Sequence, residues 1–149
     1  MAYASISKPG LHFNTKLYAQ NASTNAITGV GFQPDWTWIK NRSNADDHSL
    51  YDAVRGVTKR LKSDTNGAET TQSNGLTAFG TDGFTVGDHG GVNGNGNSIA
   101  SWNWKANSSG SSNSNGSITS TVSANTTAGF SIVKWTGTGA NGTIGHGLG

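Results

Sequence analysis

The stretch that decides the fold is Gln33-Pro-Asp-Trp-Thr-Trp-Ile-Lys-Asn-Arg42. Its Pro34-Asp35 pair is a turn signal, because proline presets φ and an aspartate side chain bonds to nearby backbone amides. The next residues have the period of two that is typical of a strand, with Trp36 and Trp38 on one face. The sequence therefore predicts a strand over residues 36–41 that begins at a tight turn.

Similar apolar runs, each bounded by Gly, Asn, Asp or Pro, recur along the chain and predict further strands. They cover residues 13–19, 27–32, 49–51, 57–61, 76–79, 83–86 and 99–104. Residues 45–55 form the one segment in which a helical turn could fit. Because the 22 glycines and the many small polar residues disfavour helices, the sequence predicts an all-β fold, an antiparallel β-sandwich.

Aromatic residues are the expected anchors of the core, because only 12% of the 149 residues are charged and five Trp, five Phe and three Tyr are present. Trp102 and Trp104 repeat the period-two spacing of the first tryptophan pair. Such pairs could form a platform for sugars, but a place in the core is favoured. The residues expected to be largely buried are Phe13, Trp38, Ile39, Phe84 and Trp102.

Several classes of protein are disfavoured by what the sequence lacks. It has no cysteine, so no disulfide framework or thiol site is available. Its N-terminus has no signal-peptide pattern, and no apolar run is long enough for a membrane helix, so we expect synthesis in the host cytoplasm and no membrane insertion. The one dense basic run, Lys59, Arg60 and Lys62, is explained by a solvated strand face, and no nucleic-acid partner is expected.

Residues 107–116 contain no apolar side chain, which is typical of a flexible linker. The chain after this stretch repeats its own beginning imperfectly: Phe130-Ser-Ile-Val-Lys-Trp135 aligns with Phe13-Asn-Thr-Lys-Leu-Tyr18. We therefore expect a sandwich domain over 1–106, a Ser/Asn/Gly linker over 107–116, and over 117–149 the first strands of a second, truncated copy of a longer natural protein. Incomplete strands of this kind favour a homo-oligomer.

Four blocks of sequence carry a resemblance to a family. They are Phe13-Asn-Thr-Lys-Leu-Tyr18, Gly31-Phe-Gln-Pro-Asp-Trp-Thr-Trp-Ile-Lys-Asn-Arg-Ser43, Asp47-His-Ser-Leu-Tyr-Asp-Ala-Val-Arg-Gly56 and Asn93-Gly-Asn-Gly-Asn-Ser-Ile-Ala-Ser-Trp-Asn-Trp104. The chain resembles an uncharacterised repeat domain of tail-fibre and other virion proteins of marine and cyanobacterial phages. The resemblance implies a jelly-roll sandwich similar to concanavalin A-like and laminin G-like domains, and it transfers no catalytic or ligand residues.

An enzymatic function is disfavoured by the carboxylates. A glycosidase of this fold needs two facing carboxylates, but Glu69 is the only glutamate and lies in a loop-like stretch. The run Asp47-His48-Ser49 cannot form a relay if it is a strand, because neighbours then point to opposite faces. We expect Asp47 and His48, with Asp52 and Arg55, to form a structural polar network around the turn before Gly56. It would include an Asp52–Arg55 ion pair.

The stretch from residue 82 to 97 is rich in hard oxygen donors. Its candidate ligand-binding residues are Asp82, Asp88, Asn93, Asn95 and Asn97. Calcium accepts six to eight such oxygens, so a Ca²⁺ site is conceivable, although the spacing of an EF-hand and its closing glutamate are missing. The same side chains could contact the hydroxyls of a glycan, but a long Gly/Asn turn without a ligand is favoured. No cofactor is expected otherwise.

The resulting hypothesis is a non-enzymatic structural or adhesion module of a bacteriophage tail fibre or similar virion appendage. The expected partners are other virion proteins, further copies of the chain and a host-surface glycan. A capsid-decorating or other virion structural protein of the same fold is the first alternative, and a carbohydrate-active enzyme is the second.

Overall fold

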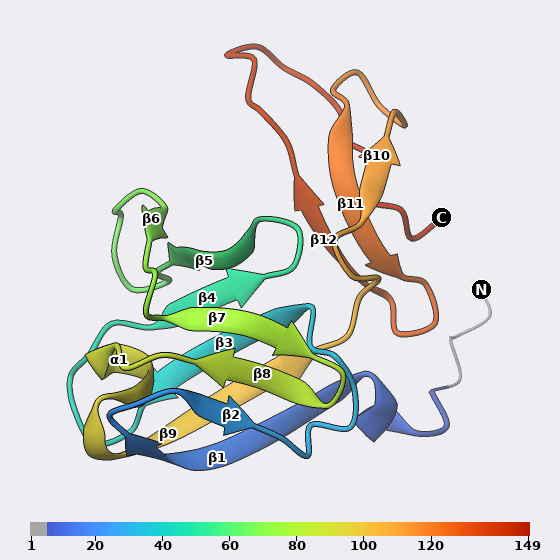
Figure 1. The fold of residues 1–149 in the computed structure, drawn as a ribbon. Helices are drawn as coiled ribbons and strands as arrows, with labels where there is room; N and C mark the ends of the chain where they lie inside the picture. Colours follow the sequence, from blue (N-terminus) through green and yellow to red (C-terminus); the bar gives the residue numbers. More distant parts are fainter. Residues whose placement is uncertain (1–5) are drawn as a thin grey trace.

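Residues 6–149, the part of the chain that the computed structural model describes, form three antiparallel sheets (Figure 1). The first five residues of the domain predicted for 1–106 lie outside this part. The helices within it are a 3-10 turn at Pro9–Leu11 and the four-residue α1, Gly90–Asn93. Neither is long and apolar enough to cross a membrane. The prediction of an all-β protein built from antiparallel strands is confirmed.

The largest sheet has six strands. In spatial order they are β1 (Phe13–Asn21), β9 (Asn95–Trp104), β3 (Trp36–Asn41), β4 (Ser49–Asp52), β5 (Gly56–Leu61) and β6 (Thr70–Thr71). Strand β9 lies between β1 and β3 and pairs with both of them along most of its length. The two strands that contain the tryptophan pairs are therefore direct neighbours, although about sixty residues separate them in sequence.

A second sheet of three strands covers one face of the large sheet. Its spatial order is β2 (Asn25–Ile27), β8 (Gly83–Val86) and β7 (Leu76–Gly80). The core lies between these two layers, and helix α1 contributes Val92 to it. Its buried side chains are Ile27, Ile39, Tyr51, Leu76, Phe84, Val86, Val92 and Ile99.

The predicted turn at Pro34-Asp35 closes one end of this core. The Asp35 carboxylate accepts a 2.7 Å hydrogen bond from the Ala106 amide, and the Asp35 amide donates to the Trp104 carbonyl at 2.8 Å. Both residues of the turn are buried. The aspartate therefore fastens the start of β3 to the end of β9, a role that reaches beyond the local turn that its sequence signal indicates.

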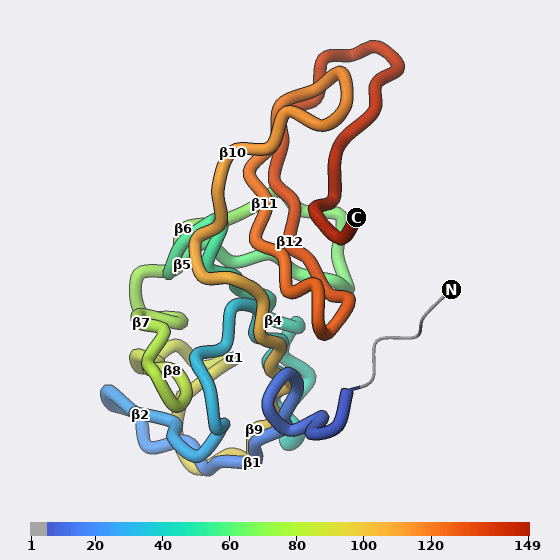
Figure 2. The backbone as a smooth tube through the Cα atoms, turned by 90° about the vertical axis from the view of Figure 1, so that its right-hand side faces the viewer, coloured from blue at the N-terminus to red at the C-terminus, as the bar shows by residue number. Residues whose placement is uncertain are grey.

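The third sheet is formed by β10 (Ser111–Asn113), β11 (Ser120–Asn125) and β12 (Phe130–Lys134), with β11 in the middle. It projects from one end of the two-layer body, with the C-terminal segment running back beside it (Figure 2). Strand β10 lies inside the predicted linker, residues 107–116. Its three polar residues pair with β11, so this part of the stretch is ordered by backbone hydrogen bonds without any apolar side chain.

Most predicted strands are found close to their expected bounds, and β3 and β8 match them at both ends. The helical turn considered for residues 45–55 is absent from that segment, because Ser49–Asp52 forms β4 between β3 and β5. The strand predicted for 27–32 is shorter, since β2 ends at Ile27 and residues 28–32 form a loop.

Candidate functional site

Four tryptophans from β3 and β9 gather on one face of the large sheet. Trp36 lies opposite Trp104 and Trp38 opposite Trp102 in the strand register. Ile39, which points to the other face of β3, is fully buried in the core between the two layers. The four indoles therefore occupy the face that points away from the second sheet, and all four are half-buried.

This placement corrects part of the predicted core. Ile39 and Phe84 are buried as expected, but Trp38 and Trp102 are only half-buried and Phe13 is 38% exposed. The predicted alternation of β3 and β9 is correct, but the core lies on the opposite face of these strands.

The reason lies in the residues that alternate with the tryptophans. The inward face carries smaller side chains, including Thr37, Ser101 and Asn103, and all three are buried. The Asn103 amide donates to the carbonyl of Asn14 at 3.2 Å and to the Ser101 hydroxyl at 3.1 Å. These bonds pair the Asn103 amide group, although Asn103 Oδ1 and Thr37 Oγ1 have no partner among the described residues. The smaller side chains fill the narrow interlayer space, and the indoles lie on the other face.

Three of these rings form a hollow with a neighbouring histidine. Trp38, His48, Trp102 and Trp104 line a space of about 180 Å³, which we call the aromatic cup. The rings of Trp38 and Trp102 have centroids 6.1 Å apart and are inclined by 60°. His48 meets Trp38 in the same edge-on manner, at 5.6 Å and 61°. The inclined rings give the cup walls as well as a floor.

A single hydrogen bond fixes the chemistry of the histidine. The indole Nε1–H of Trp38 donates to Nδ1 of His48 at 2.7 Å. An indole nitrogen can only donate, so Nδ1 must be the acceptor, and the neutral imidazole carries its proton on Nε2. Within residues 6–149, Nε2 has no hydrogen-bond partner. The His48 ring, which lines the cup, therefore carries an N–H that no group among the described residues accepts.

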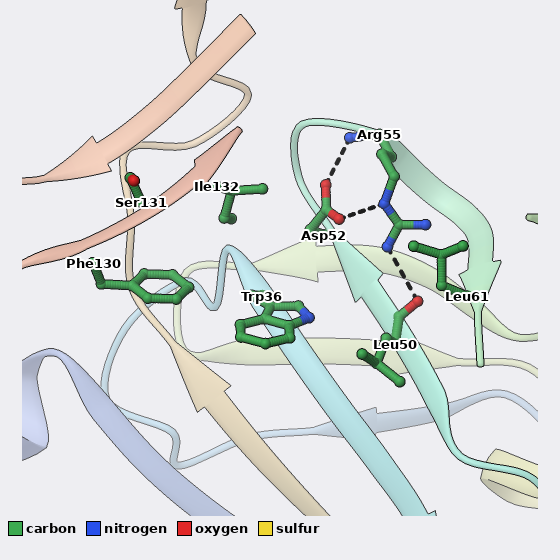
Figure 3. Close-up of a pocket in the computed structure, with 8 residues that line it drawn as sticks. All are labelled: Trp36, Leu50, Asp52, Arg55, Leu61, Phe130, Ser131 and Ile132. Atoms are coloured by element: carbon green, nitrogen blue, oxygen red, sulfur yellow. Dashed lines mark hydrogen bonds and ion pairs between the residues drawn. The ribbon is translucent and has the colours of Figure 1, made fainter. Parts of the chain in front are cut away.

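A second hollow lies where the third sheet meets the large sheet (Figure 3). Its volume is about 220 Å³, and it is lined mainly by apolar side chains from both sheets: Trp36, Leu50, Leu61, Phe130 and Ile132. Phe130 stacks on Trp36 with ring centroids 5.7 Å apart, and on Trp104 at 6.2 Å. Trp36 of this hollow stacks on Trp104 of the aromatic cup with ring centroids 4.9 Å apart, so the two hollows are neighbours.

The predicted ion pair borders this second hollow. Arg55 Nε lies 2.5 Å from the Asp52 carboxylate, which also accepts the amides of Val54 and Arg55. The guanidinium further donates to the Leu50 carbonyl at 3.2 Å, as Figure 3 shows, and to Glu69 at 3.1 Å. The prediction of an Asp52–Arg55 pair is confirmed. Since these bonds satisfy both charges within the protein, the hollow offers a ligand little beyond apolar contact.

The rest of the expected polar network is arranged differently. Asp47 pairs with Lys62 at 2.6 Å, and the hydrogen bond from this ammonium lowers the pKa of the Asp47 carboxyl. The sequence suggests His48 as a member of this network, but Arg60 makes the hydrogen bonds. It donates to the Ser49 hydroxyl at 2.9 Å and to the carbonyl of Asp47 at 3.2 Å. Sequence reasoning missed Arg60 because its basic neighbours made it resemble part of a solvated face.

The five candidate ligand residues do not come together as one site. Asp82 precedes β8 and Asp88 follows it, so the two carboxylates lie at opposite ends of that strand. Asp82 accepts the amides of Gly29 and Gly31 at 2.9 and 2.6 Å, and these bonds lower the pKa of its carboxyl. Both glycines have positive φ, which turns their amides toward the carboxylate. Asp82 is thus a clamp for the loop after β2.

The other four candidates are spread along the opposite end of the sandwich. Asp88 accepts the side-chain amide of Asn74 at 2.7 Å. Asn93 is fully buried and bonds to Asn21 and to backbone groups around it, whereas Asn95 is exposed and Asn97 half-buried. Among residues 6–149, no three carboxylate or imidazole side chains are grouped as metal ligands usually are.

The fold and this face define the chain as an antiparallel all-β protein with a solvent-facing aromatic surface. Residues 8–149 match the family described as Domain of unknown function (DUF7483), and the chain belongs to that family. Comparison with curated proteins and with solved structures gave no match.

Proposed function

We propose that this chain is a non-enzymatic structural and adhesion module of a bacteriophage tail fibre or similar virion appendage, and that it binds host-surface glycan through its aromatic face. The observation that carries the proposal is the position of the four tryptophans on the outer face of the large sheet, where Phe130 contacts Trp36 and Trp104 while Trp38 and Trp102 line the aromatic cup. Burying indoles is strongly favourable, so a protein that leaves several together on one face usually uses them for recognition.

Sugars are the ligands that suit such a face best. One side of a pyranose ring presents C–H groups that pack on an aromatic ring, while its hydroxyls need hydrogen-bond partners. The aromatic cup offers both, through Trp102 and through the free Nε2–H of His48. The placement in a virion rests on the resemblance of the four sequence blocks to phage fibre and virion domains.

The finer architecture is part of the same proposal. We take the two-layer body as a jelly-roll sandwich of the concanavalin A-like kind, and residues 117–149 as the first strands of a second copy. Phe130 begins β12 as Phe13 begins β1, in keeping with the sequence repeat. A structure of a chain extended beyond residue 149 would decide whether the repeat continues.

The adhesion function can be tested with the purified chain on an array of bacterial surface polysaccharides. The expected result is binding that the change Trp102→Ala abolishes and that Trp135→Ala, at a 51% exposed tryptophan outside the cup, leaves intact. Binding that both variants retain, or no binding to any glycan, would refute the proposed adhesion.

The virion location needs a separate test. Antibody against this chain, viewed on negatively stained virions, should label the fibres. Label on the capsid surface would instead support the alternative of a capsid-decorating protein.

A further inference from the structure

We propose that the aromatic cup binds one hexopyranose at a time, at the exposed end or branch of a glycan, and not a run of sugars within a polymer. This inference rests on the proposed function and specifies its ligand. Three features of the cup support it: its size, the aromatic contacts at its Trp104 end and the fixed imidazole of His48.

The size and shape of the cup match a single ring. Its volume of about 180 Å³ is below the range of sites for larger ligands, which begins at roughly 300 Å³. Trp38 and Trp102 are inclined by 60°, so they cannot form the flat strip on which successive sugars of an extended chain could stack. A ring that packs on Trp102 meets the edge of Trp38 as a wall.

Aromatic side chains from outside the cup contact Trp104 at one end of it. Phe130 stacks on both Trp104 and Trp36, at 6.2 and 5.7 Å, and these contacts hold β12 above that end of the tryptophan row. Phe13 packs against Trp104 from β1 at 4.9 Å. A sugar inside a polymer must continue in two directions. A chain that continues from the bound ring past Trp104 meets Phe130 and Phe13, whereas a terminal or branch residue can leave the cup in the other direction.

The donor in the cup is fixed in place, which suits recognition of one hydroxyl pattern. Trp38 holds the imidazole of His48 through Nδ1, so Nε2–H keeps one orientation. The His48 backbone is held in turn, since its amide donates to the Asp64 carboxylate at 3.2 Å and its carbonyl accepts from Arg60 at 3.3 Å. A donor positioned in this way loses little freedom on binding, so it can distinguish sugars by where they carry an acceptor oxygen.

The test is a titration of the whole chain followed through its indole N–H signals by NMR. The probes are the methyl glycosides of glucose, galactose, mannose and N-acetylglucosamine, each compared with its trisaccharide and hexasaccharide. We expect one methyl glycoside to shift the Trp38 and Trp102 signals and to leave Trp135 unmoved. Its affinity should lie within about threefold of that of its hexasaccharide, since the longer chain adds no contacts.

Two variants locate the binding. His48→Ala should weaken binding by about tenfold or more, and Trp102→Phe should reduce it less than Trp102→Ala does, because phenylalanine keeps an aromatic face. Near-ultraviolet circular dichroism checks that each variant is folded.

The outcomes separate the two proposals. A hexasaccharide that binds more than about tenfold tighter than the monosaccharide would overturn the single-ring inference and leave glycan binding standing. Binding that shifts Trp135 but neither Trp38 nor Trp102 would overturn it as well. If no probe shifts any indole signal, both proposals fail.

Discussion

Phe130 of the third sheet stacks on Trp36 of the large sheet with ring planes only 5° apart. This contact, with the one to Trp104, joins two sheets that share no backbone pairing. Three hydrogen bonds lie at the same junction: the Asn125 side chain bonds to His12 and to the Lys105 carbonyl, and the Asn107 amide donates to Ser123. Phe130 therefore supplies both aromatic contacts that position the third sheet.

The change Phe130→Ala should consequently loosen the third sheet without unfolding the sandwich. Phe130 is half-buried, so the cost should be about 1–3 kcal/mol, below that of a phenylalanine in a closed core. Hydrogen exchange of residues 120–134 should accelerate while that of β3 and β9 stays slow. Trp135→Ala is the matched control and should change neither. Equal acceleration in all strands would show that the sheets unfold as one unit.

The two clearest ion pairs of the large sheet should differ in their value to stability. Asp52 and Arg55 have side chains only 7% and 13% exposed, so Arg55→Ala leaves a carboxylate without its cation in a nearly dry site. We expect the free energy of unfolding to fall by about 2–4 kcal/mol, measured by urea denaturation. The backbone amides of Val54 and Arg55 still bond to Asp52, which keeps the loss below that of a wholly unpaired charge.

Lys62→Ala provides the comparison, because the Lys62–Asp47 pair is much more exposed and solvent screens it. Its denaturation midpoint should remain close to that of the parent chain. A loss as large as that of Arg55→Ala would mean that burial does not decide the strength of these pairs.

Strand positions could be predicted from the sequence because alternation and turn residues are local signals. Residues 36–41 show both, and β3 has those bounds. Short polar strands gave no such signal: Ser111–Asn113 is held by pairing with β11, a partner that lies further along the chain. Composition alone could not reveal it.

Which face of a strand packs into the core could not be predicted from local signals. From the sequence, either face of β3 could be the buried one, because indoles alternate with Thr37 and Ile39. The answer depends on the second sheet, which brings Leu76 and Phe84 against Ile39 and leaves the tryptophans outside. His48 could not be assigned to the cup for the same reason, since it reaches Trp38 only through the pairing of β3 with β4.

The interpretation of Asp82 as a clamp predicts a local effect. Asp82→Ala removes the acceptor of two backbone amides, so the amides of Gly29 and Gly31 should exchange with solvent much faster. Asp88→Ala, which removes a carboxylate at the other end of β8, should leave those two amides unchanged. Neither variant should alter sugar binding at the aromatic cup. A loss of sugar binding in either variant would indicate that residues 82–97 contribute to a ligand site.

The pH dependence of stability should be traceable to His89. This residue caps α1, with Nδ1 accepting the Gly91 amide at 3.2 Å, so the fold requires a neutral Nδ1. Burial, and then the nearby positive charge of Arg60, lower the pKa of His89 below its usual value of 6.5. In the unfolded chain the imidazole has its usual pKa of about 6.5. As the pH falls below this value, the unfolded state binds a proton while His89 in the folded state stays neutral, and this favours unfolding. Stability due to this group is complete above that pH and is lost progressively as the pH falls toward the folded value.

His89→Asn tests this directly, because asparagine caps a helix well and does not titrate. Urea denaturation between pH 7.5 and 5 should show a smaller loss of stability in this variant than in the parent chain. His89→Ala should lower stability by about 0.5–2 kcal/mol at pH 7.5 through loss of the cap, and should also flatten the pH dependence. His146→Asn, at an exposed histidine in the C-terminal segment, should retain the parent slope. If the slope survives in His89→Asn and disappears in His146→Asn, the cap is not the source of the pH dependence.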